Sequence, residues 1–292
     1  MRVFLAGVLA IAGAACHSHA AGPVSPTQVA DLETRLRRVE ETLAKSAEAL
    51  EFLSKVYEQQ KQQAADEEAR EPAPGAVFGV AIEPSVQAGL IEGGPAFVTI
   101  IKAFDFACPY CERSSNILTE LVKEYGGKLR VVYMDFVVHD FAEPAHLAGC
   151  AAARQGKYVP FKKAFWEKSF GSYSASRGKD RSGFEQAALL DLAKGAQLDV
   201  ERFKADMAGP ACTTLLAQER AELEKFHVSG TPAFFVNGIF IGGGVEKDTL
   251  RAVIEDRLRV AEASGVPAAQ YYDREILQKG EKKFRSKKDP RP

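Results

Sequence analysis

The chain has 292 residues, of which 46% are hydrophobic and 26% are charged. These proportions are typical of a soluble globular protein, and the length allows one large domain with accessory segments or two modest domains. The 38 basic and 39 acidic residues nearly cancel, so the overall charge gives no reason to expect a nucleic-acid partner.

The N-terminus has the pattern of an export signal over residues 1–20. A short positive region precedes an apolar stretch over residues 3–12, which is too short for a stable membrane span. Two cleavage routes remain open, because Ser18-His19-Ala20 fits ordinary signal cleavage while Gly13-Ala14-Ala15-Cys16 looks like a lipoprotein box. We expect a periplasmic or other extracytoplasmic protein, with Cys16 as a candidate lipid anchor.

Residues 26–70 are rich in Ala, Glu, Gln, Lys and Leu and contain no glycine. Their apolar residues recur at alternating three- and four-residue steps, a heptad with apolar a and d positions. The pattern predicts a helix that either joins copies of the chain through residues 26–60 or folds back as a single amphipathic helix. The apolar positions are Val29, Leu32, Leu36, Val39, Leu43, Leu50, Leu53 and Tyr57.

An alternation of strands and helices follows a predicted linker over residues 71–95, which opens with Pro72, Pro74 and Gly75. Residues 97–104 form an apolar run typical of a strand buried on both faces. Residues 109–125 read as a helix, and residues 129–138 are again rich in β-formers. Strand, helix and strand in succession predict a right-handed parallel unit and an α/β fold.

The second half of the chain is predicted as a long helical insertion followed by a hairpin. The insertion covers residues 142–226, and β character returns at residues 233–236 and 239–241. Asn237-Gly238 between these runs is a strong signal for a two-residue turn. A closing helix follows, and residues 265–292 are expected to form a C-terminal helix and a solvated basic tail.

Cys108 and Cys111 stand three residues apart where the first strand ends and the helix begins. Both sulfurs then lie on one face of the first turn, and Pro109 suits the first helical position. Cys108 meets free backbone N–H groups at the helix mouth, which favour the thiolate, so it is the predicted nucleophile. Cys111 lies deeper and would resolve the mixed disulfide.

Half of a zinc site is the main competing interpretation of this cysteine pair. A tetrahedral site needs two more ligands, and the remaining thiols, Cys150 and Cys212, form no second C-x-x-C. We therefore expect neither a bound metal nor another cofactor. His139, His146 and His227 are interpreted as packing or surface residues rather than ligands.

Two separate motifs resemble those of the DsbA-like thioredoxin-fold proteins. One is the strand and redox pair over residues 100–111, and the other is Gly230-Thr231-Pro232 with the strand that follows it. The resemblance implies a thioredoxin fold with a helical insertion, over a domain that we set at residues 96–264. It also implies a cis peptide bond before Pro232, beside the redox pair, where Thr231, Pro109 and Tyr110 would contact substrate.

The resemblance also bears on a second cysteine pair and on residues that tune the first. Related proteins often carry a cysteine pair in the insertion, so Cys150 and Cys212 are candidates for a structural disulfide, with two buried free thiols as the alternative. Lys102 stands where the family usually has an acid. It either lowers the thiol pKa, making the disulfide a stronger oxidant, or extends to solvent from a strand end. Asp105 is a lesser candidate for proton handling.

These patterns predict an enzyme that exchanges disulfides with exported proteins, served by a membrane redox partner that the sequence does not identify. The N-terminal helix favours an oligomeric isomerase, an arrangement similar to the suppressor-of-copper-sensitivity C proteins. A monomeric DsbA-type oxidase and a protein that holds Cu(I) between two thiolates are the alternatives.

Overall fold

The computed structural model describes residues 25–82 and 89–289. The predicted signal segment, with Cys16 and both cleavage routes, lies outside these residues. The chain divides into two compact units, one ending at Ala65 and the other beginning at Asp66. Within the described residues, no helix combines the length and the apolar character needed to cross a membrane.

Helix α1 spans Pro26–Arg70 and has no buried residue. Its start is fixed locally: Ser25 Oγ accepts a hydrogen bond from the Gln28 N–H, and Gln28 Oε1 accepts one from the Ser25 N–H. This reciprocal pair is a capping box, and Pro26 occupies the first helical position, where its missing N–H costs nothing. The apolar heptad positions are between 43% and 63% exposed.

The second unit is built on a five-stranded mixed sheet with the order β1-β3-β2-β4-β5. Strands β2 and β3 are parallel, and the other neighbouring pairs are antiparallel. All seven residues of β2 are buried, as its apolar run predicts. The strands are β1 (Ile91–Glu92), β2 (Val98–Phe104), β3 (Leu129–Asp135), β4 (Ala233–Val236) and β5 (Ile239–Gly242).

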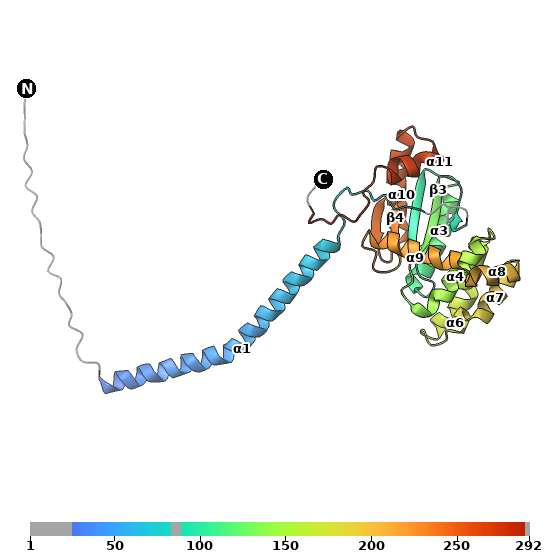
Figure 1. Cartoon of the computed structure of the whole chain (residues 1–292). Helices are drawn as coiled ribbons and strands as arrows, with labels where there is room; N and C mark the ends of the chain where they lie inside the picture. Colours follow the sequence, from blue (N-terminus) through green and yellow to red (C-terminus); the bar gives the residue numbers. More distant parts are fainter. Residues whose placement is uncertain (1–24, 83–88, 290–292) are drawn as a thin grey trace, which may run out of the picture. The chain divides into compact units, whose positions relative to one another are not determined.

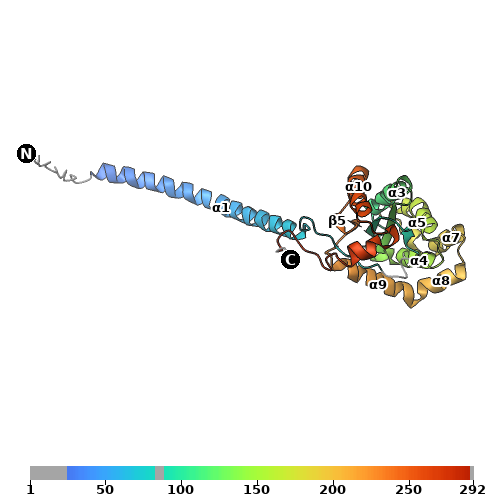
Figure 2. The same ribbon diagram turned by 90° about the horizontal axis from the view of Figure 1, so that it is seen from above.

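Two helices lie side by side near this sheet, as both views show (Figure 1 and Figure 2). Helix α3 (Pro109–Glu124) connects the parallel strands, and α10 (Lys247–Ala263) follows β5. Ion pairs from Lys247 to Glu120, at 2.8 Å, and from Arg251 to Glu124, at 2.9 Å, join the two helices. The turn between β4 and β5 has positive φ at both of its central residues, Asn237 and Gly238.

The helical insertion lies between β3 and β4, and small residues allow its helices to approach closely. Helix α4 is rich in alanine and buries seven of its eleven residues. Its elements are η1 (Asp140–Ala142), α4 (Glu143–Ala153), α5 (Tyr158–Ala164), η2 (Phe165–Ser169), α6 (Phe170–Ala175), η3 (Ser182–Phe184), α7 (Gln186–Gly195), α8 (Val200–Ala208) and α9 (Pro210–Glu224).

The segments expected to be a linker and a solvated tail are instead packed against each other. Phe78, in the expected linker, has no exposed surface and stacks on Phe284 at 5.5 Å between ring centroids. A β-bridge pairs Pro72 with Ser286. The C-terminal part begins with α11 (Ala268–Tyr271) and η4 (Tyr272–Leu277).

The positive charge of the tail is neutralised within the same unit. Arg285 pairs with Glu281 at 2.8 Å and Lys287 with Glu71 at 3.1 Å. The basic composition of this segment therefore does not make it a solvated tail. One aromatic residue and several local ion pairs suffice to hold the segment in place.

Candidate active site

Cys108 is the N-cap of α3, with an extended backbone conformation and Pro109 directly after it. Its side chain is nearly buried, at 5% exposure, and its Sγ lies 3.3 Å from the carbonyl oxygen of Thr231. The pKa of the Cys108 thiol is lowered to about 6. A hydrogen bond from the Cys111 thiol is the main cause, and the Thr231 side chain and the backbone N–H groups of Cys111 and Tyr110 add to it.

Cys111 has the opposite electrostatic character. Its side chain is fully buried one turn into α3, and burial raises the pKa of its thiol well above the usual value. The hydrogen bond that it gives to Cys108 holds its own proton more firmly. The pair therefore consists of one thiolate at the helix mouth and one protonated thiol beneath it, as a nucleophile and a resolving thiol require.

The loop before β4 borders this pair. The peptide bond between Thr231 and Pro232 is cis, and Thr231 is the residue whose carbonyl lies against Cys108. On the other side, Pro109 and Tyr110 are exposed, Tyr110 by 54%. A Cβ at position 244 would lie 3.1 Å from the Tyr110 ring, which is a tight contact, so glycine at this position leaves room for the ring.

Lys102 lies beneath the pair, on β2, with no exposed surface. Its Nζ donates hydrogen bonds to the carbonyl oxygen of Cys111 at 2.7 Å and to Ser115 Oγ at 2.8 Å. Burial lowers the pKa of the ammonium to about 7, against the attraction of the two cysteines, which raises it. The alternative that Lys102 extends to solvent is wrong, because the side chain turns inward toward α3.

Asp105 supports the active-site loop rather than the sulfurs. Its carboxylate accepts hydrogen bonds from the N–H groups of Ala107, Val138 and His139, at 2.6, 2.6 and 2.8 Å. Its backbone carbonyl accepts the N–H of Cys108 at 3.1 Å. No contact in the described part of the chain joins the carboxylate to a sulfur, so Asp105 acts on the pair by positioning it.

A buried histidine beside Asp105 was missed as part of the site. His146 has no exposed surface, and its Nδ1 lies 2.5 Å from Asp135 Oδ1. The N–H of Phe106, two residues before Cys108, donates to its Nε2 at 3.2 Å. An isolated histidine on a predicted helix carries no signal for these partners, which come from β3 and from the active-site loop.

Cys150 and Cys212 form a disulfide between α4 and α9, at a sequence separation of 62. They lie in the insertion and are 3% and 0% exposed. Among the described residues, no group of three or more His, Cys, Asp and Glu side chains is placed to hold a metal ion.

The fold and this redox pair define a DsbA-like thiol–disulfide oxidoreductase, which confirms the fold and the resemblance expected from the sequence. The family model described as Thioredoxin matches residues 91–256, more than half of the chain. The chain therefore belongs to this family.

Three comparisons place it among known proteins. It is 28% identical over 173 residues to a Na(+)/H(+) antiporter NhaA of Herminiimonas arsenicoxydans, covering 59% of this chain and 26% of that protein. The chain spans about a quarter of the length of the curated relatives it matches. A thioredoxin-like oxidoreductase from Silicibacter pomeroyi DSS-3 is 29% identical, with a TM-score of 0.51, over 62% of this chain and 99% of that one. Wolbachia pipientis alpha-DsbA1 is 18% identical, with a TM-score of 0.52, over 63% and 96%, and it shares the fold.

Proposed function

We propose that this protein exchanges disulfides with exported proteins through Cys108 and Cys111. The observation that carries the proposal is the contrast within the pair, where the pKa of Cys108 is lowered to about 6 and that of Cys111 is raised. At neutral pH one sulfur is therefore ready to attack or to leave, while the other keeps its proton until the mixed disulfide must be resolved.

In the oxidising direction, a client thiolate attacks Cys108 Sγ of the enzyme disulfide, and Cys111 leaves and takes up a proton. A second client thiolate then attacks the client sulfur of the mixed disulfide. Cys108 leaves as a stabilised thiolate, the client gains one disulfide, and the enzyme pair holds the two electrons. The reverse sequence reduces a client, and isomerisation ends when a client thiol displaces Cys108.

The loop at Thr231 and Pro232 supports an extended client segment as the substrate. The Thr231 carbonyl faces the nucleophile at 3.3 Å, and the exposed Pro109 and Tyr110 border the opposite side. A client strand can pair with the backbone of this loop while its cysteine reaches Cys108. The test uses Cys111→Ala, whose Cys108 thiolate should attack a client disulfide, release the other client sulfur as a thiolate and accumulate as a mixed disulfide with the client. Cys108→Ala should abolish insulin reduction, and wild-type activity in that variant would refute the proposal.

Lys102 is proposed to tune the redox potential. Its amine, protonated up to about pH 7, attracts negative charge on both cysteines, so in that range it favours the reduced form and makes the disulfide a stronger oxidant. Lys102→Glu reverses that charge and should lower the potential measured against glutathione. An unchanged potential would show that Lys102 does not tune the pair.

Self-association through residues 26–60 would make the enzyme an isomerase that holds several catalytic domains around one misfolded client. The support is that every apolar heptad position of α1, from Val29 to Tyr57, is exposed in this chain by 43% or more. Light scattering of the mature protein with and without residues 21–70, paired with refolding of scrambled ribonuclease, separates this arrangement from a monomeric oxidase. A monomer in both samples would exclude the oligomer.

The export pattern over residues 1–20 supports an extracytoplasmic location, where client disulfides form and where a membrane redox partner would renew the pair. Mass spectrometry of the mature N-terminus distinguishes an acylated Cys16 from cleavage after Ala20. Finding the protein in the cytoplasm with residues 1–20 still attached would contradict this location.

A further inference from the structure

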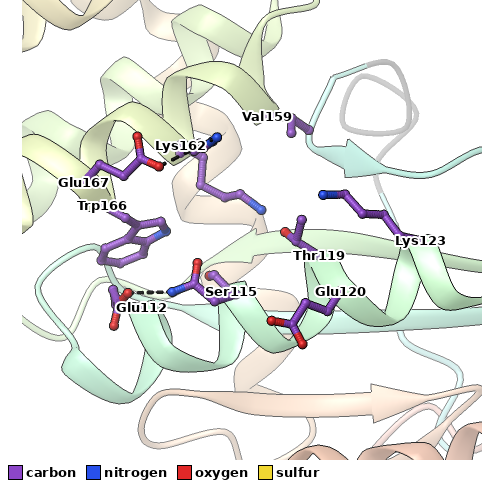
Figure 3. A pocket seen from close by; sticks show the side chains of 11 residues that line it. Glu112, Ser115, Thr119, Glu120, Lys123, Val159, Lys162, Trp166 and Glu167 are labelled. Carbon is purple, nitrogen blue, oxygen red and sulfur yellow. Dashed lines mark hydrogen bonds and ion pairs between the residues drawn. The ribbon is translucent and has the colours of Figure 1, made fainter.

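A pocket of about 400 Å³ lies between α3 and the α5–η2 segment of the insertion (Figure 3). It is separate from the loop at Thr231 and Pro232, and the proposed disulfide exchange does not use it. The volume is in the range of small-molecule sites. Its lining comes from one face of α3, including Glu112, Ser115 and Lys123, and from Lys162 and Trp166 on the opposite side.

The indole of Trp166 offers a hydrogen-bond donor at this pocket. The residue is only 6% exposed, and its ring packs on Phe106 and Phe170, with centroids 5.3 and 5.2 Å away. Within residues 25–82 and 89–289, Nε1 has no hydrogen-bond partner. A buried N–H without an acceptor is unfavourable, so a ligand that brings an acceptor here gains a strong contact.

Two lysine ammonium groups lie away from the indole, of which that of Lys162 is already paired with Glu92. Figure 3 shows the ammonium ends of Lys162 and Lys123 pointing toward each other, with Thr119 near the gap between them. Lys162 is 3% exposed and donates to Glu92 Oε2 at 2.8 Å and to Tyr133 Oη at 2.6 Å. An ammonium has three donors, so Lys162 can serve a ligand as well.

The remaining charges differ in whether they are already paired. Glu167 pairs with Lys163 at 3.7 Å, and Glu120 pairs with Lys247 at 2.8 Å. Lys123 has no ion-pair partner in the described part of the chain. Glu112, beside the redox pair, accepts a hydrogen bond from Asn116 at 2.7 Å, but that amide is neutral. The pocket therefore has an unpaired negative charge at one end and an unpaired positive charge at the other.

The spacing of these charges indicates the size of the ligand. Glu112 and Lys123 are eleven residues apart on α3, which corresponds to about 16 Å along the helix axis. The side chains of Glu112 and Lys123 span part of that distance, so the gap between their charged groups is shorter than the distance along the axis. An extended tripeptide is about 10 Å long, carries an ammonium and a carboxylate at its ends, and has carbonyl acceptors between them.

We propose that this pocket binds a short zwitterionic peptide of about three residues. Its carboxylate lies between Lys123 and Lys162, a carbonyl accepts the indole N–H of Trp166, and its ammonium faces Glu112. The ligand is a free oligopeptide, because the C-terminus of a client protein would bring the carboxylate without the ammonium that faces Glu112.

The chain offers a direct readout, because Trp166 is its single tryptophan. Trialanine should change the intrinsic fluorescence of the reduced full-length protein and shift its one indole N–H signal in a ¹⁵N spectrum. Trialanine amide, which lacks the carboxylate, and inorganic phosphate, which lacks the carbonyl groups, should do neither. A 20-residue peptide ending in the same three alanines keeps the carboxylate but has no ammonium at the Glu112 end, so it should bind more weakly than trialanine.

Variants of the lining residues then test the contacts. Lys123→Met should weaken trialanine binding about tenfold, and Lys123→Arg should retain it, since one charge-assisted hydrogen bond accounts for a change of this size. Lys168→Met, an exposed lysine of η2 outside the pocket, is the matched control and should bind as wild type. Trp166→Phe, followed by calorimetry, should also bind more weakly.

The proposal is overturned by any of three results. These are an unchanged indole signal at millimolar trialanine, equal binding of trialanine amide or phosphate, and full affinity in Lys123→Met. None of them depends on activity of the redox pair, so failure here leaves the disulfide-exchange proposal standing.

Discussion

Replacing Lys102 by methionine removes a buried amine and keeps an unbranched side chain of similar length. The wild-type ammonium has no exposed surface, and burial lowers its pKa from 10.5 to about 7. Between pH 7 and pH 10 the unfolded chain therefore carries a proton on Lys102 that the folded chain does not.

The direction of the effect follows from this difference in proton uptake. Because the unfolded state binds the extra proton, the free energy of unfolding rises with pH in this window, by about 1.4 kcal/mol per pH unit. Over three pH units the contribution of Lys102 changes by about 4 kcal/mol. Lys102→Met lacks this contribution, so the variant gains most over wild type at the acidic end and loses that advantage as the pH rises.

The assay is urea unfolding followed by circular dichroism at half-unit steps from pH 6 to pH 10. Both proteins carry Cys108→Ala and Cys111→Ala, so that no reductant is needed and the Cys150–Cys212 disulfide stays intact. Removing the two cysteines keeps the pKa of Lys102 low, because burial lowers that pKa whereas the charges of the cysteines raise it. Lys168→Met in the same background controls for loss of an exposed lysine.

The reasoning is refuted if the difference between Lys102→Met and its parent stays constant, within about 0.5 kcal/mol, across that pH range. Such a result would mean that Lys102 keeps its proton in the folded state despite its burial. A slope in Lys168→Met as large as that in Lys102→Met would equally remove the assignment to the buried amine.

Three further predictions follow from the site and the insertion. The rate of Cys108 alkylation by iodoacetamide, measured by mass spectrometry, should rise with pH with a midpoint near pH 6. Cys111→Ala should move that midpoint upward, because the hydrogen bond from Cys111 contributes most to the lowered pKa of Cys108. An unchanged midpoint in this variant would contradict that cause. Replacing Cys150 and Cys212 by alanine opens a loop with a 62-residue separation and should lower the free energy of unfolding by about 4 kcal/mol. A loss below 1 kcal/mol in urea titrations would argue against that role. His146→Leu leaves two aspartates buried beside an apolar side chain and should lower the free energy of unfolding by about 3–5 kcal/mol in the same assay. An unchanged free energy of unfolding would show that the histidine is dispensable there.

Local signals in the sequence were enough to locate the main elements of the redox site. The spacing of Cys108 and Cys111 at a strand-to-helix junction, and the Asn237-Gly238 turn after Pro232, depend on neighbouring residues only. The same holds for α1, whose cap at Ser25 and apolar repeat depend on residues close together in the sequence. Such features can be predicted because no distant partner is needed to form them.

The surroundings of the site depend on distant partners and could not be predicted. Lys102 within an apolar run is compatible with a buried or a solvent-facing amine, and only its contact with Ser115 on α3 decides between them. His146 gains its role from Asp135 on β3. Lys162 is buried because Glu92, 70 residues earlier, neutralises it. No periodicity or motif signals these pairings.

The contact between Phe78 and Phe284 sets practical limits for dissecting this protein. The two rings bring the segments before β1 and after η4 together, so a fragment cut to residues 96–264 would lose both and expose the apolar surface that they cover. An excised catalytic fragment should therefore begin no later than Glu71 and extend through Asp289. An affinity tag at the C-terminus needs a spacer, because the last described residues are part of the folded body rather than a free end.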